Sequence, residues 1–268
     1  MKVKFLVLAL FFSFLISSGY SILFYESAGF LTRRAANPRP FDSTRTNMQN
    51  NEERFPVDPT LGVWPSLDTQ DTHWLTLPVD CQGMLNKILE FASSHQGQYD
   101  HVVIIGMGGS SRPGDVIRGT LGNKDGHAQI HVMENLDQDD IAGIRTAIDP
   151  GKTLFISISK SGGTAETMAL TRIAYQWIQE AGLDPANHFI AITTTSKNSE
   201  LTRFLSENNV NPANIFEHPD QVGGRFTLFS VIGMLPAALA GHDVNKILSH
   251  ARAAMESNVK YQLGEFCL

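Results

Sequence analysis

The sequence predicts an α/β fold, with a doubly wound parallel sheet of about five strands in a three-layer αβα sandwich. Two observations predict it. First, short runs of continuous rather than alternating apolar residues recur between residues 101 and 217, which is typical of strands buried on both faces. Second, these runs alternate with segments of helical periodicity, as in consecutive strand–helix–strand units. Ligands of such sheets bind beyond the carboxyl ends of the strands.

The elements follow in order along the chain. The expected strands are residues 101–105, 130–134, 153–158, 188–193 and a short fifth at 215–217. The expected helices are one around Met84–Phe91, then 111–120, 137–148, 166–181, 198–208, an apolar run at 231–240, and a last amphipathic helix that Asp243 caps, within 243–263. We expect the last two helices to leave apolar surface exposed.

Three regions are expected along the chain. Residues 1–24 resemble a signal peptide or a membrane anchor, because lysines precede an apolar run that ends in a small-residue pattern. Residues 25–80 are rich in proline and lack periodicity, which predicts an extended arm or linker. Residues 81–263 carry the α/β domain.

Composition narrows the function classes. The net charge of −6 provides no general attraction for nucleic acid, so a site for an anion has to be local. The two cysteines, Cys81 and Cys267, lie far apart and have no metal-type spacing. They do not indicate a disulfide framework.

The most informative loop is Ser159–Thr167, between a predicted strand and a predicted helix. The amide N–H groups and the positive dipole end of that helix, together with nearby hydroxyls, suit a phosphate dianion. Lys160 adds a cation that has no acidic partner close in sequence. The alternative is an ordinary Ser/Thr helix cap, but the loop holds more hydroxyl residues than one cap requires.

Two further loops contain paired glycines. Gly106–Ser111 follows the first strand and resembles a dinucleotide fingerprint, although Ser111 stands where the third glycine belongs. Asp220–Thr227 places two glycines before Arg225, whose guanidinium suits the stabilisation of an oxyanion. Taken alone, the first loop is about as well explained as a glycine-rich turn, and the third is slightly better explained as a surface turn with a solvated arginine.

Together, the loops resemble the sugar-isomerase (SIS) domain of the phosphoglucose isomerase family. The matching motifs are Gly108-Gly109-Ser110, Ser159-Lys160-Ser161-x-x-Thr164-x-x-Thr167 and Val222-Gly223-Gly224-Arg225-Phe226-Thr227. The resemblance covers about residues 80–260 and is greatest to the bacterial form that is also found fused to transaldolase. It implies the interconversion of glucose 6-phosphate and fructose 6-phosphate through a cis-enediolate, as in glycolysis and gluconeogenesis, without a metal or nucleotide cofactor.

The resemblance also implies a role for each matching residue. The implied substrate-binding residues are Gly109, Ser110, Ser159, Ser161, Thr164, Thr167 and Gly224, and the implied catalytic residues are Arg225 and Lys160. The serines and threonines of the second loop would bind the phosphate with help from Lys160. Arg225 would stabilise the enediolate. Arg112, after the first loop, either helps to bind the phosphate or obstructs the sugar.

The general base of the family is a glutamate from the second half of the protein, and neither Glu166 nor Glu217 matches its position. We therefore expect a fragment, the first of two SIS halves, that binds a hexose 6-phosphate and catalyses little alone. Its expected partner is the missing half or a second copy in a homo-oligomer, and not nucleic acid. The alternative is a non-catalytic sugar-phosphate-binding module. The expected location is the cytoplasm, where sugar phosphates occur, although residues 1–24 favour export.

Overall fold

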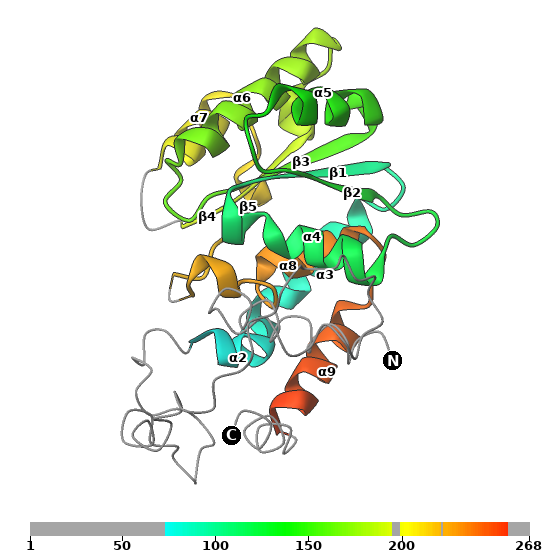
Figure 1. Cartoon of the computed structure of the whole chain (residues 1–268), viewed down its shortest axis with the longest axis vertical. Coiled ribbons are helices and arrows are strands. Elements are labelled where there is room, and N and C mark those ends of the chain that lie inside the picture. Colours follow the sequence, from blue (N-terminus) through cyan, green and yellow to red (C-terminus); the bar gives the residue numbers. More distant parts are fainter. Residues whose placement is uncertain (1–72, 195–198, 221, 257–268) are drawn as a thin grey trace, which may run out of the picture. The chain divides into compact units, whose positions relative to one another are not determined.

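Five parallel strands form the central sheet of the computed structural model (Figure 1). They lie in the order β2-β1-β3-β4-β5, and every neighbouring pair is parallel. Their bounds are β1 His101–Ile105, β2 Gln129–Met133, β3 Thr153–Ile158, β4 Phe189–Thr193 and β5 Ile215–Glu217. The predicted doubly wound parallel sheet is confirmed, and each strand begins and ends within one residue of its expected position.

The structure describes residues 73–194, 199–220 and 222–256. The expected signal peptide or anchor at 1–24, residues 25–72 of the expected arm and residues 257–263 lie outside these ranges. The first described element, α2 (His73–Asp80), is a helix in the stretch that the sequence predicts to be extended. It forms because Leu77 is buried and because α2 packs against α3 and α9. Across the described ranges, no helix has the length and apolar character needed to span a bilayer.

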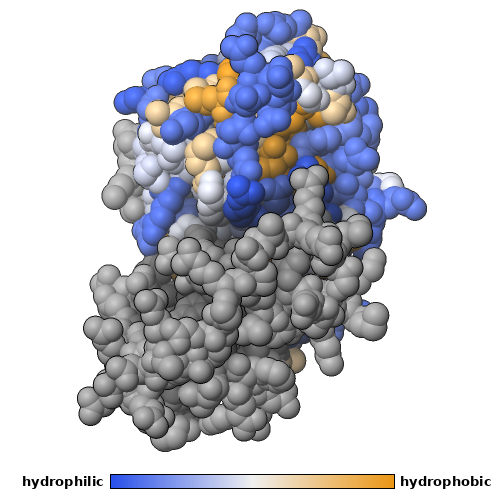
Figure 2. Space-filling model, viewed as in Figure 1, coloured by the Kyte–Doolittle hydropathy of each residue, from blue (hydrophilic) through white to orange (hydrophobic). Residues whose placement is uncertain are grey.

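Helices cover both faces of the sheet. In Figure 1, α5, α6 and α7 lie on one face, and α3, α4 and α8 lie on the other. The remaining helical bounds are α3 Gln82–Ser94, α4 Arg112–Leu121, α5 Gln138–Ala147, α6 Ala165–Glu180, α7 Glu200–Glu207, α8 Val231–Leu239 and α9 Val244–Glu256. On the face seen in Figure 2, hydrophilic residues predominate over the α5–α7 layer, with hydrophobic residues visible between them. The three layers of the predicted sandwich are therefore present.

The core explains why the middle strands lack alternation. Every residue of β3 and of β4 is buried, because helices pack on both sides of them. Phe155 stacks on Phe189 with 5.2 Å between ring centroids, and both side chains are fully buried. Complete burial of one such side chain stabilises a fold by roughly 1.5–3 kcal/mol. On the other face, α4 lies so close to β1 that a Cβ at Gly114 would be 2.3 Å from Ile104 Cδ1.

The apolar run expected at 231–240 forms α8, but the expectation of exposed apolar surface there is wrong. Every residue of α8 except Ala238 is buried. The helix packs against α3 and α4. This packing within the chain covers the apolar residues of α8 that were expected to be exposed. Asp243 precedes α9 as predicted, and its Oδ1 accepts a hydrogen bond from the Lys246 amide at 3.0 Å.

The strand order determines where a ligand has access. The chain passes from β1 outward to β2, returns to β3 on the other side of β1, and continues to β4 and β5. The direction of winding therefore reverses between β1 and β3. Loops that leave the carboxyl ends of these two strands diverge, and open parallel sheets bind their ligands in the crevice between such loops.

Candidate functional site

The three loops singled out in the sequence lie at the carboxyl edge of the sheet. The first loop, 106–111, joins β1 to α4 and includes the short 3₁₀ helix η4 (Gly108–Ser110). The second loop, 159–164, joins β3 to α6. The third loop, 218–227, follows β5 and includes η8 (Gly224–Phe226). The first two loops flank the crevice between β1 and β3.

The second loop is organised by the hydroxyl of Ser159. Ser159 Oγ accepts a hydrogen bond from the Gly162 amide at 3.1 Å and lies 3.1 Å from Thr164 Oγ1. Thr164 occupies the N-cap position of α6, yet among the described contacts its hydroxyl caps no helix N–H. The alternative of an ordinary helix cap therefore does not describe this turn. The first turn of α6 keeps the donor groups and dipole that suit an anion.

Glycine is required at position 162 of this loop. Gly162 has a φ of +65°, and a Cβ there would lie 2.1 Å from Ser199 Oγ and 2.2 Å from Ser199 Cβ. Its carbonyl accepts a hydrogen bond from the Leu201 amide at 2.8 Å. The backbone of the second loop is thus pressed onto the start of α7, in a conformation that side chains rarely adopt.

The hydroxyls of the second loop differ in exposure. Ser161 is exposed, Thr164 is half-buried, and Ser159 and Thr167 are buried. Thr167 Oγ1 has no hydrogen-bond partner in the part of the chain that the structure describes, and the same holds for Thr193 Oγ1 at the end of β4. Buried hydroxyls without a partner are uncommon and destabilise a fold. The second loop and the strand end beneath it therefore hold two of them.

Lys160 contacts the third loop rather than the hydroxyls around it. Its Nζ donates to the carbonyl oxygen of Asp220 and, at 3.3 Å, to that of Val222. The sequence indicates a lysine without a nearby acidic partner. The structure provides two backbone acceptors, at 60 and 62 positions along the chain.

Thr227 joins the third loop to the first. Its Oγ1 lies 2.8 Å from the carbonyl oxygen of Gly109 and 2.9 Å from that of Gly224. The two glycines also lie close together, since a Cβ at Gly224 would be 3.9 Å from Gly109 Cα. Thr227 is completely buried. The sequence contains it within a matching motif but gives no sign of this role, which only the fold reveals.

The other predicted residues fall at the same edge. Gly109 and Ser110 lie half-buried in η4, and Gly224 lies exposed in η8. Arg225 follows Gly224 in η8, and its side chain is outside what the structure describes. Glu166, exposed in the first turn of α6, contributes to none of the hydrogen bonds that link these loops.

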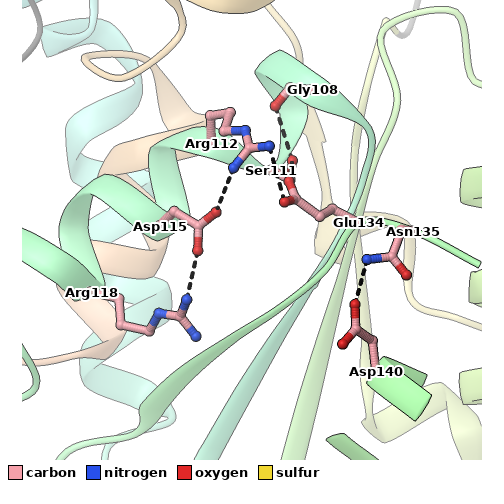
Figure 3. Close-up of polar contacts among 8 residues, drawn as sticks. All are labelled: Gly108, Ser111, Arg112, Asp115, Arg118, Glu134, Asn135 and Asp140. Carbon is pink, nitrogen blue, oxygen red and sulfur yellow. Dashed lines mark hydrogen bonds and ion pairs between the residues drawn. The ribbon is translucent and has the colours of Figure 1, made fainter. Parts of the chain in front are cut away.

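The Arg112 side chain extends toward Glu134, the residue that follows β2 (Figure 3). Its guanidinium pairs with Glu134 at 3.2 Å and with Asp115 at 3.3 Å. Glu134 also accepts a 2.7 Å hydrogen bond from the hydroxyl of buried Ser111. A cation at the start of α4 opposes the helix dipole, and the two carboxylates offset it. These two ion pairs hold the guanidinium of Arg112, and the two roles considered for it at the substrate site stay predictions.

His218 is a buried residue of the third loop that no sequence motif marks. Its side chain is 1% exposed, and Nδ1 lies 3.0 Å from the Pro219 carbonyl, to which it donates. Burial lowers the pKa of His218 to about 4, and the positive charge of Lys160 acts in the same direction. The imidazole is therefore neutral at pH 7. It adds no second positive charge beside Lys160.

One cavity lies at the opposite, amino edge of the sheet. It has a volume of about 270 Å³ and is lined in part by Tyr99, Lys124, His127 and His242. None of the predicted site residues lines it. Within the described ranges, no group of three or more His, Cys, Asp or Glu side chains could hold a metal ion.

The all-parallel, doubly wound sheet and the linked loops at its carboxyl edge define a sugar-isomerase (SIS) type of domain. The chain belongs to the phosphoglucose isomerase family, whose model matches residues 89–261.

Relatives and solved structures agree with this assignment. Glucose-6-phosphate isomerase of Thermus thermophilus is 32% identical over 185 residues, covering 69% of this chain and 43% of the relative. That of Cupriavidus taiwanensis is 38% identical over 167 residues, covering 59% and 29%. A hypothetical protein of Thermus thermophilus superposes with a TM-score of 0.62 at 28% identity, covering 73% of this chain and 45% of the other. A Chlamydia trachomatis glucose-6-phosphate isomerase shares the fold, with a TM-score of 0.55 at 23% identity over 67% and 35%. The chain spans less than half the length of each.

Proposed function

We propose that this chain binds a hexose 6-phosphate at the carboxyl edge of its sheet. We further propose that it forms the first part of an isomerase that interconverts glucose 6-phosphate and fructose 6-phosphate. One observation carries the proposal: side-chain bonds from Lys160 and Thr227 join loops from three strands at one edge of the sheet. Membership of the phosphoglucose isomerase family supports the choice of substrate.

In this proposal the second loop holds the phosphate. Ser161 and Thr164 have accessible hydroxyls, and Ser159 orients Thr164 from below at 3.1 Å. The uncapped first turn of α6 adds backbone N–H donors and a positive dipole end. Thr167, buried one turn further along, belongs to the lower wall of the phosphate site.

The sugar would then extend toward the first and third loops. Gly109 and Gly224 place backbone close together without side chains, which leaves room for hydroxyl groups to approach. Gly109, Ser110 and Gly224 would contact the sugar. Arg225 follows directly, and we assign it to the oxygen atoms on C1 and C2.

The reaction moves one proton between adjacent carbons. A base takes the proton from C2 of the open-chain aldose, the C–H electron pair forms the C1–C2 double bond, and the C1 carbonyl π pair moves to O1 to give a cis-enediolate. The proton returns to C1 as O2 loses its hydroxyl proton and forms the C2 carbonyl, and O1 takes up a proton to give the ketose. A guanidinium at the position of Arg225 would stabilise the charge on the enediolate oxygens as it forms. Donors placed where charge develops are worth roughly 2.7–4 kcal/mol each in the best-studied cases.

In this proposal the chain does not supply the general base. Glu166 and Glu217 lie close to the loops in sequence, and neither matches the position of the family's base. The chain alone therefore binds its ligand and turns it over slowly at most. We place it in the cytoplasm, where sugar phosphates are available, and its catalytic partner is a second SIS half or a second copy.

Calorimetric titration with fructose 6-phosphate tests the site. The wild-type chain should bind, and a Ser159→Ala/Thr164→Ala double variant should bind at least roughly tenfold more weakly, since it loses the Thr164 hydroxyl and the Ser159 hydroxyl that orients it. A Ser93→Ala/Ser94→Ala double variant at the end of α3 is the matched control. Equal affinities in the wild type and the site variant would rule out this phosphate site.

An isomerase assay separates binding from catalysis. At high protein concentration we expect little turnover of fructose 6-phosphate. Substantial turnover that Arg225→Ala abolishes would show that the chain carries a complete active site, and would overturn the proposed absence of a base.

A further inference from the structure

The side chain of Lys160 spans two loops. Its backbone, which is part of the second loop, is fixed because the Lys160 carbonyl accepts hydrogen bonds from the Thr194 hydroxyl and from the Thr194 amide. Its Nζ ends in the third loop, on the carbonyls of Asp220 and Val222. Both ends of the residue are therefore fixed, one on each loop.

The acceptors of Lys160 lie immediately before the glycines of the third loop. Val222 precedes Gly223, and the Gly223 carbonyl in turn accepts a hydrogen bond from the Phe226 amide at 2.9 Å. The backbone that carries Gly224 and Arg225 is thus held on one side by Lys160 and on the other by Thr227.

The surroundings favour an ammonium that bonds to backbone. His218 packs beside it in its neutral form and directs its own Nδ1–H to Pro219. None of the ion pairs found within the described ranges involves Lys160. An ammonium has three N–H donors, and the hydrogen bonds found within the described ranges account for two of them. An anion in the second loop would take the third.

We propose that Lys160 is a positioning residue that couples the second loop to residues 222–227 of the third. An anion bound by the second loop accepts a hydrogen bond from the third N–H of Lys160. The ammonium is then held more firmly on the carbonyls of Asp220 and Val222. Occupancy of the phosphate site then orders the backbone that presents Arg225 before any chemistry occurs. The effect of a bound anion rests on the proposed function. The link between the second and third loops rests only on the hydrogen bonds of Lys160.

Hydrogen exchange measured by mass spectrometry tests the link in the absence of ligand. Lys160→Met keeps most of the apolar stem and removes the donors. We expect amides of residues 222–227 to exchange roughly ten- to hundredfold faster in this variant, as for loss of a charge-assisted hydrogen bond, while strands β3 and β4 keep their protection. Lys152→Met, in the turn immediately before β3, is the matched control and should leave 222–227 unchanged. Lys160→Arg keeps charge and donors and should restore part of the protection.

Inorganic phosphate, added to the wild type, tests the coupling. Phosphate should slow exchange in 159–167 and also in 222–227, and in Lys160→Met the second effect should be absent. If phosphate protects only 159–167 in the wild type, Lys160 is an ordinary anion ligand and the coupling is wrong. If Lys160→Met leaves 222–227 unchanged without ligand, the link itself is wrong. If the free variant loses protection while wild type binds no fructose 6-phosphate, the link stands and the proposed function fails. Should Lys160→Met not fold, the wild-type phosphate experiment and Lys160→Arg still decide between these outcomes.

Discussion

The two edges of the sheet are built in different ways. At the amino edge, the turns that enter β3, β4 and β5 are 3₁₀ turns of one kind, in which Asp or Asn precedes Pro. Their capping bonds are Asp149 Oδ1 to the Gly151 amide at 2.9 Å, Asp184 Oδ1 to the Ala186 amide at 3.0 Å and Asn211 Oδ1 to the Ala213 amide at 2.9 Å. At the carboxyl edge, Lys160 and Thr227 contact loops 60 to 118 positions away.

The difference separates structural turns from a candidate site. Each amino-edge turn is capped by its own Asp or Asn side chain within three residues. The carbonyls of Lys152 and Asn187 in two of these turns also accept hydrogen bonds from the Asp100 amide and the Tyr99 hydroxyl. The carboxyl-edge loops depend on one another, and the described hydroxyls of Thr167 and Thr193 lack partners there. Loops whose side chains bond to one another, as those of Lys160 and Thr227 do here, are the ones that a shared ligand can order.

The largest effect is expected at Gly162. Gly162→Ala should lower the free energy of unfolding by roughly 2–4 kcal/mol, because the new Cβ would overlap Ser199 and the backbone has a positive φ. Gly163→Ala is the control, since a Cβ there meets no described atom within 4 Å. Urea denaturation of the two variants measures the difference. Similar costs at both positions would mean that the second loop is not pressed onto α7.

His218, at the carboxyl edge of the sheet, should make stability depend on pH. The pKa of His218 is lowered from 6.5 to about 4 in the folded chain, so the unfolded chain binds more protons between these values. Stability from His218 is complete above about pH 6.5 and falls as the pH drops to about 4, by at most about 3 kcal/mol. Denaturation at a series of pH values measures it. His218→Gln should flatten the curve, and His250→Gln at an exposed position of α9 should not; identical curves would contradict the burial of a neutral imidazole.

Substitutions at two threonines, one at each edge of the sheet, allow a direct comparison of the edges. Thr227→Val removes the bond between the first and third loops, and Thr153→Val removes a 2.6 Å bond to the Asp149 carbonyl at the amino edge. Each should cost about 1–2 kcal/mol of stability, since a buried threonine side chain loses its hydrogen bond to a carbonyl oxygen. Only Thr227→Val should weaken fructose 6-phosphate binding, by roughly tenfold for a disturbance of about 1.4 kcal/mol in calorimetry. Equal binding in both variants would remove the distinction between the edges.

The smallest effect is expected in the amino-edge turns. Asp184→Ala deletes one local, exposed hydrogen bond and should cost about 0.5–1 kcal/mol in thermal or urea unfolding. Affinity for fructose 6-phosphate should be unchanged. A loss of affinity here would mean that the amino edge takes part in the site.

The sheet and helices could be predicted because their signals are local. Apolar runs such as 153–158 and 188–193 mark buried strands wherever they occur, and Asp243 caps the helix that immediately follows it. The failures share one cause, which is dependence on distant residues. The apolar run of α8 looked unpartnered because its cover, α3 and α4, lies far back in the chain. The helix α2 depends on packing against α9 in the same way.

The candidate site could be predicted in position but not in its contacts. Parallel strands place their carboxyl ends together, so the three loops had to lie at one edge. Nothing in the sequence around Lys160 indicates that its acceptors are the carbonyls of Asp220 and Val222, since every residue offers a carbonyl. The same applies to Thr227. Arg112 was left open between two roles, and its pairing with Glu134 depends on the adjacency of β1 and β2.

The central claim is that three loops at the carboxyl edge form one sugar-phosphate site. The most direct measurement is amide hydrogen exchange of the wild-type chain with and without fructose 6-phosphate. The account predicts added protection in 106–111, 159–167 and 222–227 together, and none in the amino-edge turns at 149–152, 184–187 and 211–214. Protection confined to one loop, or protection at the amino-edge cavity around His127 and His242, would contradict it.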